Sequence, residues 1–343
     1  MIDKTKKLDF SEKIKIAIDD MAAQKGYDIS GYKILDVLKR PMSIVYKIKL
    51  TFHKSDSFII YLKHNTTHSH QNKPQLSERD HETTLFWWEK FEKSDKYNVV
   101  EPLYIDSIEH ILISKESKGY DISVYLTKTA QMFPSPRAQT VIMEMISLVG
   151  GWLKYFQSVT VDDEKGSEEI SLEFINQYIN QRMDRIIEKT KIGFDESMRN
   201  RVNTYISDLW QKVGDERNLR CYLHSDLSLS NVLYNDNKIT VLDFTKRLSG
   251  SPYKDLTRFY HQLTILGLKP TFQTKFIRYL ESEFLRGYGN PRIMDEPLFK
   301  IYLMTHIINH LGKSARYWEQ SFLSGLYNRW VVYKTMKKLK TLV

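Results

Sequence analysis

This sequence has almost no cysteine and no long apolar run, and both absences restrict what the protein can be. Its 343 residues include a single cysteine, Cys221, so no disulfide can form within the chain, as is usual in a reducing cytoplasm. No stretch of about 18 uncharged apolar residues occurs, and the first residues lack the apolar run of a signal peptide. We therefore expect a cytoplasmic protein without a transmembrane helix.

Several familiar functional motifs are also missing. The sequence contains no P-loop, no nucleophile elbow, no internal repeat and no nucleic-acid-binding motif. The net charge of +9 would by itself allow nucleic acid, a membrane surface or anionic small molecules as partners. Net charge is the only feature that would support a nucleic-acid binder, so we expect no nucleic-acid partner. The hydrophobic content of 41% is ample for a buried core in one large domain or two ordinary ones.

What the sequence does have is a dense group of polar residues near position 230. They occur in the order His224, Asp226, Asn231 and then Asp243. Asp226 and Asn231 are five residues apart, the interval found in the catalytic loop of kinases, H-x-D-x-x-x-x-N. Isolated Asp and Asn residues are common in turns and caps. The inference therefore depends on the whole composite, including the apolar runs on either side of these residues.

Two short β-rich runs, 232–234 and 239–242, follow the loop and are separated by Asn-Asp-Asn-Lys. This pattern predicts a tight β-hairpin. Asn231 lies just before the first strand of the hairpin, and Asp243 lies just after the second. We therefore expect the hairpin to bring these two side chains close together.

This arrangement suits phosphoryl transfer from ATP, which needs metal ions on the phosphates and a carboxylate that orients the attacking hydroxyl. Magnesium prefers hard oxygen ligands, so the Asn231 carbonyl and the Asp243 carboxylate are the predicted metal ligands. We assign Asp226 as the catalytic base that accepts the hydroxyl proton. We place His224 in the catalytic loop as a brace for the backbone rather than as a reacting group.

At this point a family resemblance is clear. HSDLSLSN, then VLDF, then YKDLTRF resemble the aminoglycoside phosphotransferase and choline kinase-like family, which is related to protein kinases. Its members read H-G-D-x-x-x-x-N, I-D-F or I-D-W, and D-L-A, and the match covers about forty residues. Ser225 replaces the usual Gly, and Thr245 stands where protein kinases have the Gly of D-F-G. By its place in D-L-T-R, Asp255 is expected to support the catalytic loop, with an ordinary acid at a helix N-terminus as the alternative.

The resemblance implies an α+β fold of the bilobal protein kinase-like type. A small antiparallel β-sheet lobe with one main helix would be followed by a larger, mostly helical lobe. We expect a nucleotide-binding lobe over 1–114, a hinge over 115–119, and a catalytic and acceptor-binding lobe over 120–343. In the first lobe, residue patterns predict helices over 8–24 and 77–93, and strands over 32–38, 44–52, 58–63, 98–104 and 108–114.

The same resemblance assigns nucleotide contacts in the first lobe. Lys63 would hold the α- and β-phosphates, and Glu82 would be its ionic partner, although Glu82 could equally belong to an exposed helix face. The turn before Ser43 contains no glycine, so Ser43 is either a phosphate contact or part of a plain hairpin turn. Ser114 and Glu116 in the hinge would offer backbone groups to the adenine edge.

The predicted activity is ATP- and Mg²⁺-dependent transfer of the γ-phosphate to a hydroxyl of a small molecule. We favour a sugar or glycan acceptor, anionic or lipid-linked, because a chain of charge +9 suits polycationic aminoglycosides poorly. The alternatives are an aminoglycoside or amino-alcohol (choline-type) kinase and a catalytically silent kinase-like binding protein. The basic C-terminal segment 328–343 either packs on the fold with solvated lysines or makes weak contact with a membrane surface.

Overall fold

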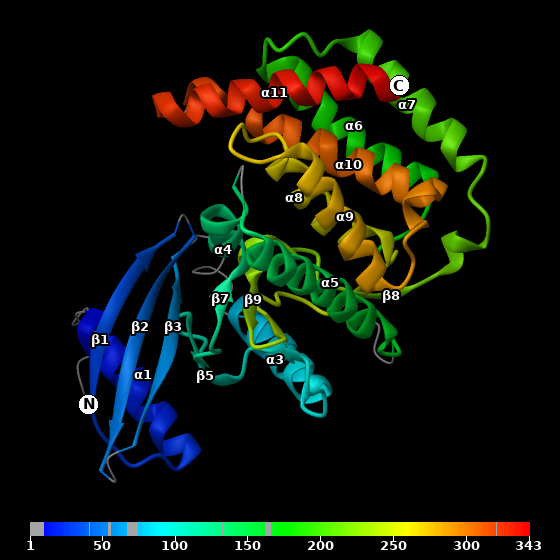
Figure 1. The fold of residues 1–343 in the computed structure, drawn as a ribbon. Coiled ribbons are helices and arrows are strands. Elements are labelled where there is room, and N and C mark those ends of the chain that lie inside the picture. Colours follow the sequence, from blue (N-terminus) through cyan, green and yellow to red (C-terminus); the bar gives the residue numbers. More distant parts are fainter. Residues whose placement is uncertain are drawn as a thin grey trace. The chain divides into compact units, whose positions relative to one another are not determined.

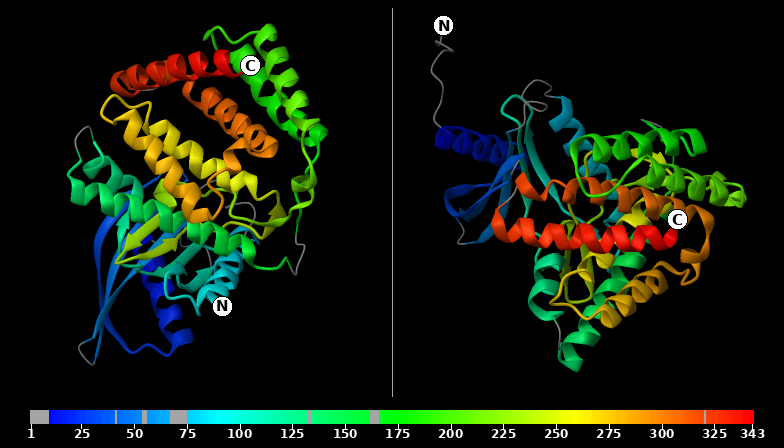
Figure 2. Two further views of the ribbon diagram at one scale, coloured as in Figure 1. Left: turned by 45° about the vertical axis from the view of Figure 1, so that its right-hand side comes forward. Right: turned by 90° about the horizontal axis from the view of Figure 1, so that it is seen from above.

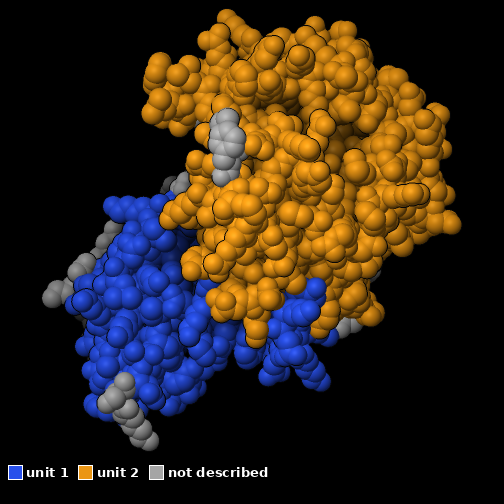
Figure 3. All heavy atoms as spheres, in the orientation of Figure 1, with its two compact units in different colours: residues 1–119, 240–246 blue, residues 120–239, 247–343 orange. Residues whose placement is uncertain are grey.

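The computed structural model describes residues 10–40, 42–53, 56–66, 75–131, 134–161, 166–319 and 321–343. The chain divides into two units (Figure 3). Unit 1 comprises 1–119 together with 240–246, and unit 2 comprises 120–239 together with 247–343. The first boundary follows Gly119. The short segment 240–246, which carries Asp243, is part of unit 1, although the sequence alone assigns it to the second lobe.

Unit 1 contains an antiparallel five-stranded sheet with the strand order β1-β2-β3-β6-β5 (Figure 1). Its strands are β1 (Ile29–Lys39), β2 (Ser43–Phe52), β3 (Ser57–Asn65), β5 (Pro102–Asp106) and β6 (Ile111–Lys115). The strand predicted over 98–104 is two strands with different partners, because β4 (Tyr97–Val99) pairs with β10 (Lys238–Val241) in a separate sheet and β5 pairs with β6. Just after β4, the Val100 N–H still donates to the Val241 carbonyl of β10 at 3.3 Å.

Among the described residues of unit 1, two helices accompany this sheet. Helix α1 (Phe10–Lys25) buries Ile14, Ile18 and Met21 in one core cluster with residues of β2, β3, β5 and β6. Helix α3 (Gln75–Phe91) runs beside β4 and β5. Both helices lie within two residues of the ranges predicted from apolar spacing. In each, apolar residues recur every three or four positions, and this pattern is sufficient to identify an amphipathic helix.

Unit 2 is mostly helical. Its helices are α4 (Ile122–Thr129), α5 (Pro136–Ser158), α6 (Leu172–Lys189), α7 (Glu196–Trp210), α8 (Tyr253–Leu266), α9 (Thr274–Tyr288), α10 (Pro297–Ser314) and α11 (Phe322–Leu342). Helix α10 is central and packs against α6, α7, α8 and α11 (Figure 2). It is accordingly the most apolar of them, with buried residues on all sides.

Helices α5 and α9 cross closely, and glycine permits the approach. A Cβ on Gly150 would lie 2.1 Å from the Phe284 carbonyl oxygen, and one on Gly287 would lie 1.9 Å from that of Ser147. Any side chain at either position would force the helices apart. This crossing fixes α5, the helix that lies under the catalytic loop.

A short turn separates helices α10 and α11. Helix α10 continues to Ser314, the short 3₁₀ turn Tyr317–Glu319 follows, and α11 begins at Phe322. Across the part of the chain that the structure describes, no helix is both long and apolar enough to cross a membrane.

Candidate active site

A buried carboxylate supports the backbone of the predicted catalytic loop, 224–231. Strand β8 (Cys221–Leu223) pairs with β11 (Leu248–Gly250) and leads into the loop. The Asp255 carboxylate is 0% exposed and accepts the backbone N–H groups of His224 at 2.6 Å and Ser225 at 2.9 Å. Burial raises the pKa of Asp255, and the neighbouring His224 and the two N–H groups oppose that rise. The structure confirms that Asp255 supports the loop.

Ser225 has a left-handed backbone, with φ of +66°. Glycine adopts this conformation without steric cost, which explains why the resembled family uses Gly here. The Ser225 hydroxyl is buried and has no hydrogen-bond partner among the described residues. The substitution therefore keeps the loop geometry but adds local strain.

The predicted base, Asp226, projects from this braced loop. Its backbone N–H donates to Nδ1 of His224 at 3.3 Å, so His224 acts as a brace. The Asn231 side-chain nitrogen donates to the Asp226 carbonyl at 3.0 Å and approaches its Oδ2 at 3.4 Å. Because the Asn231 nitrogen is used in this way, the group that Asn231 can offer a metal is its carbonyl oxygen. The second carboxylate oxygen of Asp226, Oδ1, accepts from Arg258 of α8.

Helix α5 completes the floor of the loop. The ring of Trp152 lies edge-on to the His224 ring, with the centroids 6.5 Å apart. Gln157 donates to the Pro252 carbonyl at 3.0 Å and accepts from the Tyr288 hydroxyl at 2.7 Å. Gln157 thus ties α5 both to α9 and to the segment that precedes α8.

The hairpin predicted after the loop is present. Strands β9 (Val232–Asn235) and β10 (Lys238–Val241) are joined by Asp236 and Asn237, with φ of +43° and +63°. Positive φ at both central residues is the signature of a type I′ turn, which Asn and Asp tolerate. Asn231 belongs to unit 2 and Asp243 to unit 1. Their shared metal site stays a prediction.

Within unit 1, Lys63 on β3 reaches Asp243. The Lys63 Nζ lies 2.7 Å from the Asp243 Oδ1, and both side chains are partly exposed. Asp243 also has a left-handed backbone, with φ of +64°. The structure thus brings together the residue predicted to hold phosphates and one predicted to hold the metal.

Helix α3 fixes the segment that carries Asp243. The Arg79 Nε donates to the Thr245 carbonyl at 2.7 Å, and the Trp87 ring lies 6.2 Å from that of Phe244. Arg79 also pairs with the buried Asp80 at 3.2 Å. Sequence reasoning missed Arg79 and Asp80, although extending the spacing of Trp87 and Phe91 back along the helix would have placed Asp80 on the buried face.

Glu82, the predicted partner of Lys63, occupies a different face of α3 and is exposed. Lys63 is paired with Asp243 instead. The physical reason is helix rotation: Ser77, Asp80, Thr83, Trp87 and Phe91 form the buried face, and Glu82 lies well away from it. The exposed-face alternative describes Glu82 correctly.

The remaining predicted nucleotide contacts lie in unit 1. Ser43 begins β2, is 6% exposed, and accepts the Arg40 N–H through its carbonyl at 2.8 Å. Ser114 lies in β6 opposite Tyr61. Glu116 follows that strand; its N–H donates to the Ile59 carbonyl at 2.9 Å, and its carboxylate pairs with Lys47 at 2.9 Å. Their roles toward a nucleotide stay predictions.

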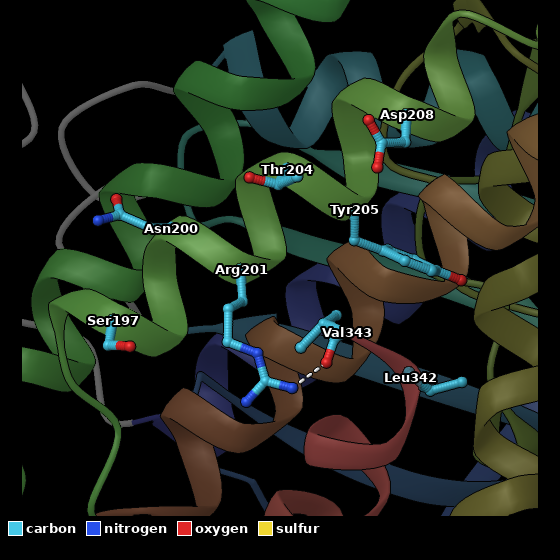
Figure 4. Close-up of a pocket in the computed structure, with 8 residues that line it drawn as sticks. All are labelled: Ser197, Asn200, Arg201, Thr204, Tyr205, Asp208, Leu342 and Val343. Atoms are coloured by element: carbon cyan, nitrogen blue, oxygen red, sulfur yellow. Dashed lines mark hydrogen bonds between the residues drawn. The ribbon is translucent and has the colours of Figure 1, made fainter.

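A separate pocket of about 650 Å³ opens between α7 and the end of α11 (Figure 4). It is lined by polar residues of α7, and Arg201 contacts the Val343 carbonyl there. None of the predicted site residues lines it. Among the residues that the structure describes, no group of three or more His, Cys, Asp or Glu side chains could hold a metal.

A scan of protein-family models finds no match to this sequence, and no curated protein sequence matches it. Solved structures do match over almost the whole chain. A macrolide 2′-phosphotransferase from Brachybacterium faecium has a TM-score of 0.52 and 16% identity, covering 92% of this chain and 97% of its own. A choline kinase from Cryptosporidium parvum has a TM-score of 0.57 and 14% identity, covering 97% of both chains.

A third similar structure is an amicoumacin kinase in complex with AMP-PNP, Ca²⁺ and its substrate, with a TM-score of 0.52, 14% identity and 96% of each chain covered. At these identities the likeness concerns the fold. The chain has the protein kinase-like α+β fold, with an antiparallel sheet in its N-terminal part and helices in its C-terminal part. This confirms the fold that the sequence predicts.

Proposed function

We propose that this protein is an ATP- and Mg²⁺-dependent phosphotransferase that acts on a hydroxyl group of a small molecule. The observation that carries the proposal is the braced loop around Asp226. Its carboxylate is 54% exposed, while its backbone is fixed through His224, Asn231 and the buried Asp255. A solvent-accessible carboxylate on a rigid loop is what orienting an incoming hydroxyl requires.

Each site residue has a distinct role in this proposal. Asp226 orients the acceptor hydroxyl and accepts its proton, while His224 holds the loop backbone. Lys63 binds the nucleotide phosphates, and Asn231 and Asp243 supply a carbonyl and a carboxylate oxygen to magnesium. Both are hard oxygen donors, which fits this ion, and bound magnesium would neutralise charge on the phosphates.

The identity of the acceptor belongs to this proposal as well. The similar structures include a choline kinase, a macrolide phosphotransferase and an amicoumacin kinase. They support the alternative of an aminoglycoside or amino-alcohol acceptor better than the sugar or glycan that net charge favours. Choline, ethanolamine, aminoglycosides and macrolides are therefore the first compounds to test as acceptors.

A silent binding protein is the competing function, motivated by the glycine-free turn before Ser43 and by Thr245; Ser225 is the other departure from the family pattern. The local geometry argues against it. Ser225 adopts the left-handed backbone that glycine would have, and the Thr245 carbonyl is engaged by Arg79. Neither substitution removes a residue that is predicted to bind the metal or to accept the hydroxyl proton.

Contact with a membrane surface has weaker support. On α11, Phe322, Leu326 and Trp330 are exposed at helical spacing, and Arg329 and Lys337 are exposed on the same helix. The similar structures do not support such contact, so it stays a prediction. Sedimentation with vesicles of phosphatidylglycerol, compared with phosphatidylcholine, tests it directly.

The proposed function is tested by thermal-shift titration followed by a turnover assay. MgATP should stabilise the wild type by mass action and should stabilise Asp243→Ala much less. Asp226→Ala should bind MgATP like the wild type, yet its kcat should fall by orders of magnitude with an accepted alcohol. The exposed Asp208→Ala, on α7, is the matched control. No shift with any nucleotide would favour the binding protein, and near-normal turnover by Asp226→Ala would remove Asp226 as the base.

A further inference from the structure

Arg258, on α8, forms an ion pair with the carboxylate of the proposed base. Its Nη2 donates to the Asp226 Oδ1, while Asn231 approaches the other carboxylate oxygen at 3.4 Å. The Arg258 side chain is only 21% exposed, whereas that of Asp226 is 54% exposed. The guanidinium therefore approaches the base from the protein side and leaves the other side of the carboxylate open.

Arg258 has hydrogen-bonding capacity that this contact does not use. A guanidinium presents five N–H donors in a planar fork. Its Nε is buried and has no hydrogen-bond partner among the described residues. A buried donor without an acceptor raises the free energy of the folded protein, and the cost is larger when the donor belongs to a charged group. Water or a ligand that accepts the hydrogen bond removes this cost.

The groups around Arg258 do not supply that partner. His261 lies one turn along α8, and the His310 ring of α10 contacts the His261 ring. Burial lowers the pKa of His261, His306 and His310, so they are neutral at pH 7 and add no charge. The Arg258 Nε has no hydrogen bond to any of these rings. Lys254, one turn earlier on α8, is paired with Glu168. Among the described residues, Asp226 supplies the only carboxylate that forms an ion pair with Arg258.

We propose that Arg258 binds an oxyanion beside Asp226 during the reaction, an inference that rests on the proposed function. In that reaction the acceptor oxygen forms a bond to the γ-phosphorus, and the bond from phosphorus to the ADP oxygen breaks with its electron pair. The hydroxyl proton goes to Asp226. Arg258 takes no part in the proton transfer and contributes a positive charge and oriented N–H donors.

The oxyanion has two chemically equivalent sources. It is either the phosphoryl group in transfer or a carboxylate or phosphate on the acceptor itself. Both would be recognised through the same paired N–H donors. If the oxyanion is the phosphoryl group, nucleotide affinity should depend on Arg258. If it belongs to the acceptor, the KM for the acceptor should depend on Arg258 instead.

The nucleotide arm compares the dissociation constants of Mg·AMP-PNP and MgADP by calorimetry for wild type, Arg258→Ala and Arg258→Lys. Arg278→Ala, an exposed arginine on α9, controls for loss of one positive charge. If Arg258 binds the transferred phosphoryl, Arg258→Ala should weaken Mg·AMP-PNP by roughly tenfold to a hundredfold and leave MgADP unchanged. Arg258→Lys should fall between, because it keeps the charge and loses the fork.

The acceptor arm measures kcat and KM for anionic alcohols and their uncharged counterparts: glycerate and glycerol 3-phosphate against glycerol, and gluconate against glucose. Choline and ethanolamine serve as cationic alcohols without an oxyanion. If the oxyanion belongs to the acceptor, Arg258→Ala should raise KM for the anionic alcohols alone by at least about tenfold, with kcat and both nucleotide constants unchanged. If none of these alcohols is phosphorylated, the nucleotide ratio alone decides.

The remaining outcomes overturn the proposal. If Arg258→Ala lowers kcat equally for every acceptor and changes neither the nucleotide ratio nor KM, Arg258 only positions Asp226. An unchanged Arg258→Ala enzyme overturns it as well. Should Arg258→Ala fail to fold, as judged by circular dichroism, Arg258→Lys carries the same comparison. A wild type that binds neither nucleotide is a different result, because it removes the proposed function itself.

Discussion

Lys63 and Asp243 are 180 residues apart in sequence, yet Lys63 Nζ lies 2.7 Å from Asp243 Oδ1. Both side chains are partly exposed, at 33% and 47%, so the pair contributes under about 1 kcal/mol to stability. Such a weak ion pair fits a binding role. Lys63 could turn to the nucleotide phosphates and Asp243 to the metal with little loss of stability.

The first prediction concerns this pair. Lys63→Met should leave the melting temperature of the free protein nearly unchanged, because little stabilisation is lost. It should weaken MgATP binding by at least about tenfold, because a cation on the phosphates is lost. Calorimetric titration measures the effect, and Lys49→Met on β2 is the control, since Lys49 is exposed on the neighbouring strand. Equal MgATP affinity in the two variants would exclude Lys63 from the site.

The second prediction tests the brace under the catalytic loop. In Asp255→Asn, an amide NH₂ would replace one of the two oxygens that accept N–H groups from His224 and Ser225. The free energy of unfolding should fall by about 1–3 kcal/mol, because a buried donor then faces another donor. Urea denaturation measures this, with the exposed Asp208→Asn as control. We expect kcat to fall together with stability. An unchanged free energy of unfolding would show that the two hydrogen bonds do not stabilise the folded protein.

The third prediction is a stabilising substitution. Ser225→Gly should raise the free energy of unfolding by about 1 kcal/mol, because it removes left-handed strain and an unpartnered buried hydroxyl. The flexibility of glycine in the unfolded chain offsets part of this gain. Ser228→Gly is the matched control in the same loop; with φ of −140°, Ser228 has no such strain, so that variant should be destabilised. If both variants lose the same stability, the strain at Ser225 is absent.

The fourth prediction is a loss of stability in mild acid. Burial holds the pKa of His306 at about 3 and that of His310 at about 4, below the usual value of 6.5. Below pH 6.5 the unfolded chain therefore binds protons that the folded chain refuses. The stabilisation is fully present above pH 6.5 and is lost as the pH falls toward 4, by about 1.4 kcal/mol per pH unit for each imidazole.

Urea denaturation between pH 7.5 and 5 measures this dependence. His306→Gln should flatten the slope by close to one proton, because the amide can still donate to the Lys254 carbonyl but does not titrate. Asp255 and Glu281, whose pKa burial raises, act in the opposite direction. For that reason the difference between variant and wild type is the informative quantity. The same slope in both proteins would contradict a neutral, buried His306.

The catalytic loop and the hairpin after it could be predicted from sequence because their determinants are local. Asp236 and Asn237 suit a type I′ turn through their own backbone preferences. Asp226 and Asn231 bond to each other across five residues. Helix ranges such as that of α1 were predictable for the same reason, since apolar spacing repeats within a few turns.

The ionic partners in the site were decided by tertiary structure. The sequence favoured Glu82 for Lys63, but the rotation of α3 buries Asp80 and exposes Glu82. The contact between Arg258 and Asp226 spans 32 residues and depends on how α8 packs beneath the loop. Periodicity defines which residues share a helix face, but not which distant side chain that face meets. That choice follows from packing long-range elements together, which no local pattern encodes.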